Sequence, residues 1–200
     1  MDLFNNDTII NILPFDGIVH YHGKVFKQQQ SQFYLEQLLQ TIQWKNDEAI
    51  IFGKHIITKR KAAWYGDTGF FYTYSGTTKT ALPWTKALLE IKTIVENKSE
   101  TTFNSCLLNL YHNGEEGMAW HSDDESSLGV NTIIASVSFG AKRKFSLKHK
   151  LDKQTVSVML ENGSLLVMKG STQTNWLHSL PKTKTVHKPR VNLTFRTIVD

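Results

Sequence analysis

Hydrophobic residues in the first half of the chain recur at helical spacing. The leucines and isoleucine at positions 35, 38, 39 and 42 fall on one face of a helix, which predicts an amphipathic helix over residues 31–43 with Ser31 as its N-cap. A second helix is predicted after Pro83, which suits a first helical turn, and Asn97 can end it. The apolar face of this second helix consists of Trp84, Leu88, Ile91 and Val95.

From about residue 103 the pattern changes to short runs of β-branched and aromatic residues that are separated by glycine. These runs predict strands at 105–111, 132–139, 143–148, 155–160, 164–168 and 190–198. Two helices followed by many short strands indicate an α+β chain in which a β-sandwich or open barrel is backed by helices. No repeat or linker divides the chain, so we expect one compact unit.

The last predicted strand has one polar and one apolar face. Its polar residues are Arg190, Asn192, Thr194 and Arg196, and they alternate with Val191, Leu193, Phe195 and Thr197. If the strand lines a barrel, the apolar face packs against the helices and the polar face lines the interior. Buried guanidinium groups need an anion, and a small dicarboxylate suits them. The alternative is an edge strand whose polar face meets water.

A similar alternation occurs on the strand 105–111. Asn109 and Tyr111 share one face, and Leu108 and Leu110 share the other. The amide and the phenol could hydrogen-bond the same carboxylates as the arginines. They could equally belong to a structural hydrogen-bond network.

A candidate metal site is spread over two segments. His121 and Asp123 lie two positions apart, so in extended backbone both project from the same face. His178 follows a later apolar strand and could return to the same rim. Two histidines and one carboxylate form the facial triad of non-haem Fe(II) oxygenases. The alternatives are a chance His-x-Asp triplet and an ordinary loop histidine.

The charge distribution refines this picture. The chain has a formal net charge of +5, the segment Lys54–Lys61 carries four basic residues and no acid, and the segment 142–188 is also strongly basic. Acidic residues gather between Glu115 and Glu125. An acidic pocket within a basic surround suits a metal centre that acts on a phosphate-bearing polymer. The alternative is a set of solvated loops.

Composition excludes several classes of protein. Apolar residues make up 40% of the chain and charged residues 20%, which is typical of a globular domain. The single cysteine, Cys106, excludes an internal disulfide framework. We find neither a membrane-length apolar run nor a signal peptide, and therefore expect an intracellular protein, cytoplasmic or nuclear, with no membrane partner.

Together these motifs resemble the AlkB family of Fe(II)- and 2-oxoglutarate-dependent dioxygenases, and most closely its eukaryotic-type DNA-repair members. The resemblance covers about three quarters of the chain. It runs through Ile51-Phe52-Gly53-Lys54, Trp64-Tyr65-Gly66-Asp67, Tyr72-Thr73-Tyr74-Ser75-Gly76, Trp120-His121-Ser122-Asp123-Asp124-Glu125, Ala135 to Ala141, His178-Ser179-Leu180-Pro181 and Pro189 to Arg196.

The resemblance implies a double-stranded β-helix, or jelly roll, with an N-terminal nucleotide-recognition lid. Residues 1–102 then form the N-terminal extension with its helices and lid, and residues 103–200 form the dioxygenase core. The implied iron ligands are His121, Asp123 and His178. The residues implied around 2-oxoglutarate are Asn109, Tyr111, Arg190, Thr194 and Arg196, with Asn192 on the same strand face.

The resemblance also implies substrate contacts. Tyr74 matches an aromatic residue that stacks on the flipped base, and Phe52, at a hairpin tip, matches one that fills the gap left in a duplex. Further matching or nearby positions are Arg60, Tyr72, Ser75, Asp124 and Glu125. Two departures stand out: Lys59 replaces a proline that many relatives carry before Arg60, and Ala62 lacks a polar side chain found in some of them.

The function implied is oxidative demethylation of 1-methyladenine and 3-methylcytosine in DNA. It uses Fe(II), 2-oxoglutarate and O2 and releases succinate, CO2 and formaldehyde, and we expect the enzyme to be monomeric. One alternative keeps the cofactors but acts on RNA or another substrate, because core motifs do not encode the substrate. Another is a module that binds modified bases without turnover.

Overall fold

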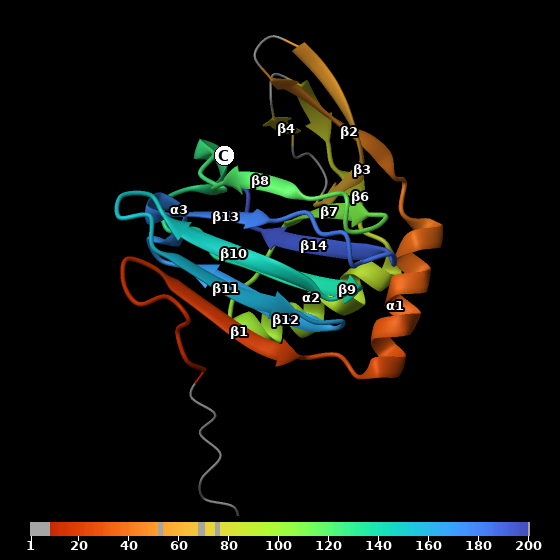
Figure 1. Ribbon diagram of the computed structural model, residues 1–200. Coiled ribbons are helices and arrows are strands. Elements are labelled where there is room, and N and C mark those ends of the chain that lie inside the picture. The colour runs from red at the N-terminus through yellow and green to blue at the C-terminus, as the bar shows by residue number, and fades with distance from the viewer. Residues whose placement is uncertain (1–8, 52–53, 68–70, 75–76, 200) are drawn as a thin grey trace, which may run out of the picture.

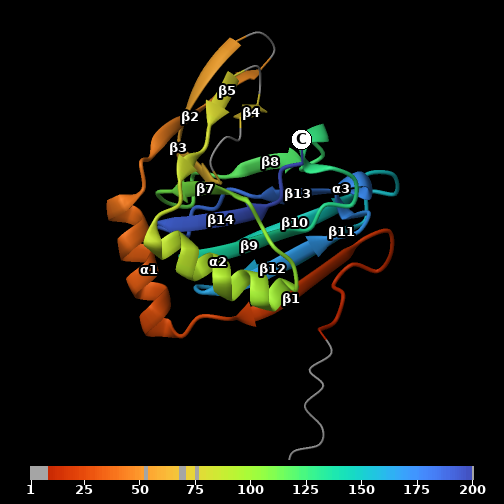
Figure 2. The ribbon, with the colours of Figure 1, turned by 180° about the vertical axis from the view of Figure 1, so that it is seen from behind.

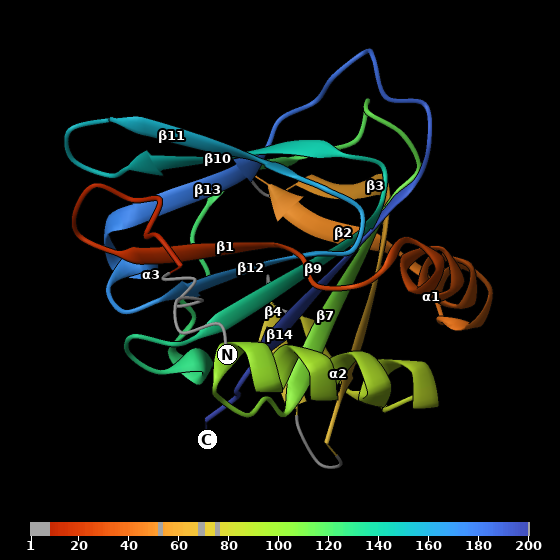
Figure 3. The same cartoon turned by 90° about the horizontal axis from the view of Figure 1, so that it is seen from below.

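Two antiparallel sheets lie face to face, and two helices cover the outer face of the larger one (Figures 1 and 3). This arrangement comes from a computed structural model, which describes residues 9–51, 54–67, 71–74 and 77–199. Facing antiparallel sheets backed by helices are the predicted jelly-roll architecture.

The larger sheet has the strand order β1-β12-β9-β14-β7-β3-β2, with β6 paired to β3. Its strands are β1 (Ile18–Lys24), β2 (Lys45–Ile51), β3 (Lys54–Gly66), β6 (Leu82–Pro83), β7 (Ser105–Tyr111), β9 (Ile134–Gly140), β12 (Ser164–Lys169) and β14 (Arg190–Arg196). The smaller sheet has the order β11-β10-β13-β8. Its strands are β8 (Met118–His121), β10 (Arg143–His149), β11 (Thr155–Leu160) and β13 (Trp176–Leu180).

The two predicted helices exist, but their boundaries differ from the prediction. Helix α1 spans Gln28–Thr41 and begins after Lys27, whose N–H donates to Oε1 of Gln30 over 3.1 Å. Ser31 therefore lies inside α1, where its hydroxyl donates to the carbonyl of Lys27. The N-cap prediction was wrong because a glutamine side chain satisfies the helix start one turn earlier.

Helix α2 spans Lys86–Ser99, later than predicted at both ends. Thr85 is the N-cap, and its side chain accepts a hydrogen bond from the N–H of Leu88, whereas Pro83 lies in β6. The helix continues past Asn97 and ends where Glu100 adopts a left-handed conformation at φ 54°.

The apolar face of β14 packs against these helices, as the alternation predicts. Val191, Leu193 and Phe195 are fully buried and share one core with Leu38 of α1 and Leu88 of α2. Seen from behind, α2 lies across this face of the larger sheet (Figure 2). Since β14 pairs with β9 on one side and β7 on the other, it is a central strand and the edge-strand alternative is wrong.

A second core fills the space between the sheets. Ile134 and Leu166 of the larger sheet pack with Leu147 and Trp176 of the smaller one, and all four are almost wholly buried. The polar face of β14 points to the same side of the larger sheet. The space between the sheets is therefore apolar at one end and polar at the other, which makes room for a site.

Strands β2 and β3 form the predicted hairpin at one edge of the larger sheet, and this hairpin extends beyond the other strands (Figure 1). A smaller hairpin of β4 (Phe71–Tyr74) and β5 (Thr77–Thr80) lies close to it. The lid predicted for this region stays a prediction. Within the described ranges, no helix has the length and apolar character of a membrane span.

Strands β1, β8 and β13 were not predicted as such. β1 pairs with β12, so part of the N-terminal region belongs to the larger sheet, together with β2 and β3. The N-terminal and C-terminal parts therefore share one sheet, and the division at residue 102 stays a prediction about chain organisation. The histidines in β1 and β13 interrupt the apolar runs from which buried strands are recognised.

Candidate metal and cosubstrate site

A cavity of about 620 Å³ opens at the polar end of the space between the sheets. Its floor is formed by β14 and β7, and β8 and β13 form one wall. Residues of β2 and β3 form the other wall. All nine residues predicted around the metal and the cosubstrate line this cavity, namely Asn109, Tyr111, His121, Asp123, His178, Arg190, Asn192, Thr194 and Arg196. The predicted substrate contact Glu125 lines it too.

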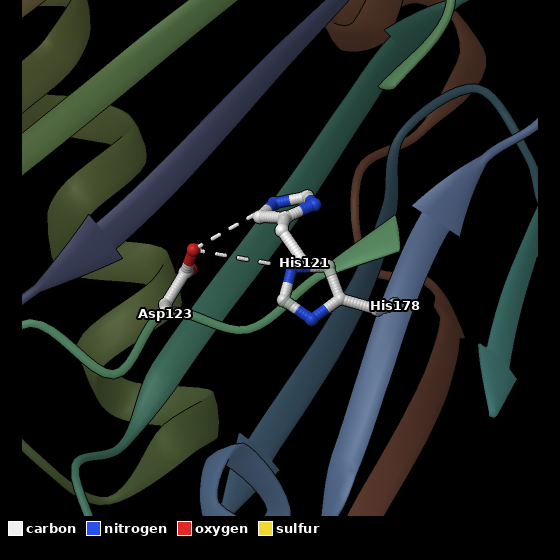
Figure 4. A group of neighbouring side chains, drawn as sticks. All are labelled: His121, Asp123 and His178. Atoms are coloured by element: carbon white, nitrogen blue, oxygen red, sulfur yellow. Dashed lines mark ion pairs between the residues drawn. The ribbon is translucent and has the colours of Figure 1, made fainter. Parts of the chain in front are cut away.

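The three predicted iron ligands converge in this cavity (Figure 4). Nε2 of His121 lies 3.8 Å from Oδ1 of Asp123, and Nε2 of His178 lies 3.9 Å from the same oxygen. Ligand atoms bound to one divalent ion at about 2.0–2.2 Å are themselves roughly 3–4 Å apart. The donor set of two imidazoles and one carboxylate therefore fits a metal ion.

Pairing of two strands brings the histidines together. β13 runs antiparallel to β8, and His178 stands directly opposite His121, with ring centroids 4.2 Å apart. Nδ1 of His121 lies 2.8 Å from the carbonyl oxygen of Ala119. When Nδ1–H donates to this carbonyl, Nε2 keeps its lone pair for a metal.

Asp123 is held from two sides. Its backbone N–H donates to Oε1 of the buried Gln173 over 2.9 Å, and its Oδ2 accepts a hydrogen bond from Nη2 of Arg196 over 2.7 Å. Burial by itself raises the pKa of Asp123, but the charges of Arg196 and the two histidines together bring it below the ordinary value. Asp123 is therefore ionised at neutral pH, as a metal ligand must be.

His178 is neutral at neutral pH for a different reason. It is 6% exposed, and burial beside Phe145 lowers its pKa to about 4. The negative charge of Asp123 acts in the opposite direction but does not outweigh burial. A neutral imidazole is the form that binds metals.

The polar face of β14 forms the floor of the cavity. Nη2 of Arg190 donates to Oδ1 of Asn192 over 2.6 Å and to Oγ of Ser138 over 2.9 Å, and Nδ2 of Asn192 donates to Oγ1 of Thr194 over 2.8 Å. These hydrogen bonds fix the orientation of the side chains on this face relative to one another. They present a rigid polar surface to anything in the cavity.

Arg190 has the properties of an anion receptor. It is 2% exposed, its Nε has no hydrogen-bond partner among the residues that the structure describes, and no described carboxylate forms an ion pair with it. Burial lowers its pKa to about 10. Since a buried cation without a counter-charge is costly, the site fits a carboxylate ligand at this position.

Tyr111 stands at the centre of a cationic cluster. Three guanidinium carbons lie 5.5 to 5.9 Å from the centroid of its ring, those of Arg60, Arg143 and Arg190. The face of an aromatic ring attracts cations at such distances. Tyr111 therefore helps to keep positive charge at the cavity.

Arg60 links the β2–β3 hairpin to the floor. Its guanidinium donates to the carboxylate of Asp47 in β2 and to the amide oxygen of Asn109 in β7. This is the only one of the four basic residues predicted in the segment Lys54–Lys61 that lines the cavity, within the described parts of the chain.

The predicted substrate contacts divide into four groups. Arg60 and Glu125 line the cavity, but the carboxylate of Asp124 accepts a hydrogen bond from Ser122 and lies 3.6 Å from Nζ of Lys150, outside the lining. The backbones of Tyr72 and Tyr74 lie in β4. Phe52 and Ser75 lie outside the described residues.

The acidic run from Glu115 to Glu125 does not form a single acidic pocket. Glu116 hydrogen-bonds His112 in the loop between β7 and β8, whereas Asp123 and Glu125 face the cavity. The residues are adjacent in sequence, but β8 separates the two groups in space.

Sequence reasoning missed three residues that build the site. Asp47 contacts Arg60, and Gln173 contacts Asp123. Arg143 is fully buried and donates to three backbone carbonyls near the cavity, those of Asn113, Glu116 and Pro181. Isolated polar residues such as these carry no pattern, and their partners are distant in sequence.

Comparison with known sequences places the chain in a family. The sequence model of the 2OG-Fe(II) oxygenase superfamily matches residues 17–196. Human alpha-ketoglutarate-dependent dioxygenase alkB homolog 3 is 41% identical over 180 residues, which cover 85% of this chain and 62% of that protein. Mouse DNA oxidative demethylase ALKBH2 is 40% identical over 185 residues, which cover 88% of this chain and 74% of that protein. The chain thus spans less than two thirds of the length of the human relative.

Solved structures with the same fold are more distant in sequence. The structure of OsALKBH1 aligns with a TM-score of 0.61 at 16% identity, covering 92% of this chain and 99% of that one. A prolyl hydroxylase from Trichoplax adhaerens, solved with a hypoxia inducible factor peptide, aligns with a TM-score of 0.61 at 14% identity, covering 90% of this chain and 83% of that one. The sequence matches and this shared fold show that the chain belongs to the AlkB family of the 2OG-Fe(II) oxygenase superfamily.

Proposed function

We propose that this chain catalyses oxidative demethylation of N-alkylated bases in DNA, with Fe(II), 2-oxoglutarate and O2 as reactants and succinate, CO2 and formaldehyde as products. The observation that carries this proposal is the meeting of the His121, Asp123 and His178 side chains with the buried, carboxylate-free Arg190 in one cavity. The names of the relatives, which include DNA oxidative demethylases, support the choice of substrate.

In this proposal His121, Asp123 and His178 hold the iron. Bound together, the iron and 2-oxoglutarate would activate O2, which is the oxidant that converts a methyl group on nitrogen to a hydroxymethyl group, while 2-oxoglutarate is oxidised to succinate and CO2. The hydroxymethyl group leaves as formaldehyde without the help of a protein base. The protein therefore has to position its reactants and exclude water.

The floor of the cavity receives the cosubstrate. Arg190 binds one carboxylate of 2-oxoglutarate, and Asn192 and Thr194 keep its guanidinium in place through their shared hydrogen bonds. Asn109 and Tyr111, on the neighbouring strand β7, face the same space. Arg196 lines the same space and belongs to the proposed cosubstrate residues, and its hydrogen bond to Asp123 helps to keep that ligand ionised.

The methylated base enters from the side of the β2–β3 hairpin. Reaching a methyl group on a Watson-Crick edge requires the base to leave the stack. In the proposal Arg60 and Glu125 contact the base, Tyr72, Tyr74 and Ser75 belong to the lid that covers it, and Phe52 fills the gap in the duplex. Asp124, whose carboxylate faces Lys150, orders the neighbouring loop.

Mass spectrometry of methylated DNA and RNA oligonucleotides tests the proposal. We expect loss of the methyl mass from DNA that carries 1-methyladenine or 3-methylcytosine, together with succinate in equal amount. Loss from RNA alone would assign the chain to an RNA substrate. Binding without any succinate would identify a module that recognises modified bases, and would refute the enzyme proposal.

Variants of the ligands provide the matched control. His121→Ala and Asp123→Ala should both abolish demethylation, because each leaves the ion with two protein ligands. Substantial formaldehyde from either variant after removal of metal would contradict the proposed ligand set.

Two further measurements test the remaining parts of the proposal. Light scattering on the same samples checks the expected monomer. Comparison of the activity of Phe52→Ala on single-stranded and duplex DNA checks the role of Phe52.

A further inference from the structure

The wall of the cavity contains an ion pair that belongs to neither the metal site nor the cosubstrate site. Asp47 lies in β2 and Arg60 in β3, and both side chains are 11% exposed and line the cavity. Arg60 also donates to Asn109 and lies 5.9 Å from the centroid of the Tyr111 ring. The pair is therefore fixed at the boundary between the hairpin and the cavity floor.

The charges of the cavity show what Asp47 contributes. Seven lining residues carry a formal charge, namely Lys45, Asp47, Arg60, Asp123, Glu125, Arg190 and Arg196. Arg196 pairs with Asp123, and the proposed function assigns Arg190 to a carboxylate of the cosubstrate. Lys45 and Glu125 have opposite signs. The positive charge of Arg60 is then balanced by the negative charge of Asp47, and loss of the Asp47 carboxylate would leave a net positive charge on the cavity wall that β2 and β3 form.

We infer that Asp47 is a specificity-determining residue, which cancels the charge of Arg60 so that the cavity admits positively charged methylated bases. This inference rests on the proposed function and names the class of base within it. A methyl group on N1 of adenine or N3 of cytosine is added to a nitrogen that carries no proton, so the base becomes a cation. A methyl group on N3 of thymine replaces a proton, so that base stays neutral.

Electrostatics sets the size of the expected effect. One uncompensated unit charge at roughly 8 Å from a cationic base, in an effective dielectric constant of about 40, disfavours binding about fivefold. A neutral base does not experience this repulsion. The signature of Asp47 is therefore a change in the ratio between cationic and neutral substrates, and not a uniform loss.

Asp47→Asn provides the test, because asparagine keeps the shape of the side chain and an oxygen that accepts from Arg60. We would measure kcat/KM on two DNA oligonucleotides of the same sequence that carry 3-methylcytosine or 3-methylthymine at the same position. The ratio of the two values should fall about fivefold in Asp47→Asn. In the double variant Asp47→Asn with Arg60→Gln both charges are gone, and the ratio should return toward that of the unaltered protein.

Glu36→Gln is the matched control. Glu36 is an exposed residue of α1 that accepts a hydrogen bond from Gln32, and its substitution removes the same charge far from the cavity. Its ratio should equal that of the unaltered protein. An equal loss on both lesions in Asp47→Asn, or an unchanged ratio, would overturn the inference, because Asp47 would then act only through structure or not at all.

Failure of the proposed function would look different. In that case the unaltered protein would release no formaldehyde from any oligonucleotide. Binding then replaces turnover as the readout. Fluorescence anisotropy would measure the dissociation constants of Mn(II)-loaded protein for the same two oligonucleotides, and the ratio of these constants would be compared between the proteins. A ratio that does not change between the unaltered protein and Asp47→Asn would refute the role of Asp47 in this assay too.

Discussion

Nη2 of Arg196 donates a hydrogen bond to Oδ2 of Asp123 over 2.7 Å, and both side chains are almost wholly buried. The bond joins the end of β14 to the loop that follows β8, and so connects the two sheets. It also leaves Oδ1 of Asp123 facing the two histidines. One carboxylate thus presents Oδ1 to the candidate metal site and accepts a buried hydrogen bond with Oδ2.

Arg196→Met should destabilise the metal-free protein, because it leaves the carboxylate of Asp123 buried without its guanidinium partner. We expect the free energy of unfolding at pH 7 to fall by about 3 kcal/mol, measured by urea denaturation. The pKa of Asp123 is lowered in the folded protein, so the stabilisation exists above the pKa of the unfolded state and is lost as the pH falls through the folded value. The difference between the two proteins should therefore shrink at low pH.

Arg196→Lys is the control for this prediction, because it keeps a positive charge near Asp123. It should lose less stability than Arg196→Met. If both variants unfold at the same urea concentration as the unaltered protein, the ion pair does not stabilise the fold.

The buried imidazole of His178 predicts a loss of stability in mild acid. Its pKa is about 4 in the folded protein and about 6.5 in the unfolded chain, so between these values the unfolded chain binds more protons. Stability therefore falls as the pH falls through this window. For the metal-free protein His178 should account for about 2 kcal/mol of the loss between pH 7 and pH 5.

Denaturation of His178→Asn at both pH values isolates this contribution. The variant lacks the titrating group and should lose less stability than the unaltered protein over the same interval. An equal loss in both proteins would show that other groups cause the acid sensitivity.

Gln173 should influence metal affinity without touching the metal. Its Oε1 accepts the backbone N–H of Asp123, and it lies in α3 (Thr172–Asn175) just before the strand that carries His178. It therefore sets the relative position of two proposed ligands. We expect Gln173→Ala to weaken Mn(II) binding at least tenfold, measured by titration calorimetry.

Gln173→Glu retains an acceptor oxygen for the N–H of Asp123 and should keep more of the affinity than Gln173→Ala. Equal affinity in the unaltered protein and in Gln173→Ala would exclude this positioning role. The readout is metal binding alone, so it does not depend on turnover.

Arg190→Gln should weaken 2-oxoglutarate binding. Truncating one partner of a buried charge pair typically costs several kcal/mol, so we expect the dissociation constant to rise roughly hundredfold. Calorimetry on Mn(II)-loaded protein without O2 measures this constant. Lys144→Gln, at an exposed position of β10, removes the same charge outside the cavity and should leave the constant unchanged; an unchanged constant in Arg190→Gln would show that another group binds the carboxylates.

Periodicity in the sequence was enough to predict the helices, most strands of the core and the two faces of β14. These features depend on residues close in sequence, whose side chains repeat with the period of a helix or a strand. Alternation and spacing also singled out the candidate site residues on β7 and β14 and the candidate metal ligands His121, Asp123 and His178, and the resemblance to a family implied the role of each. Strands β1, β8 and β13 were not predicted because they contain histidines, which interrupt or shorten the apolar runs from which strands are recognised.

The sequence by itself determined which residue types are present for the chemistry: two imidazoles, a carboxylate and a strand with alternating arginines. Only the tertiary structure decided their partners, because ion pairs and hydrogen bonds depend on distances between segments far apart in the chain. The two arginines of one strand face illustrate this. Arg196 donates to Asp123 in the loop after β8, whereas Arg190 forms no ion pair with a described carboxylate, and no local pattern in the sequence contains this difference.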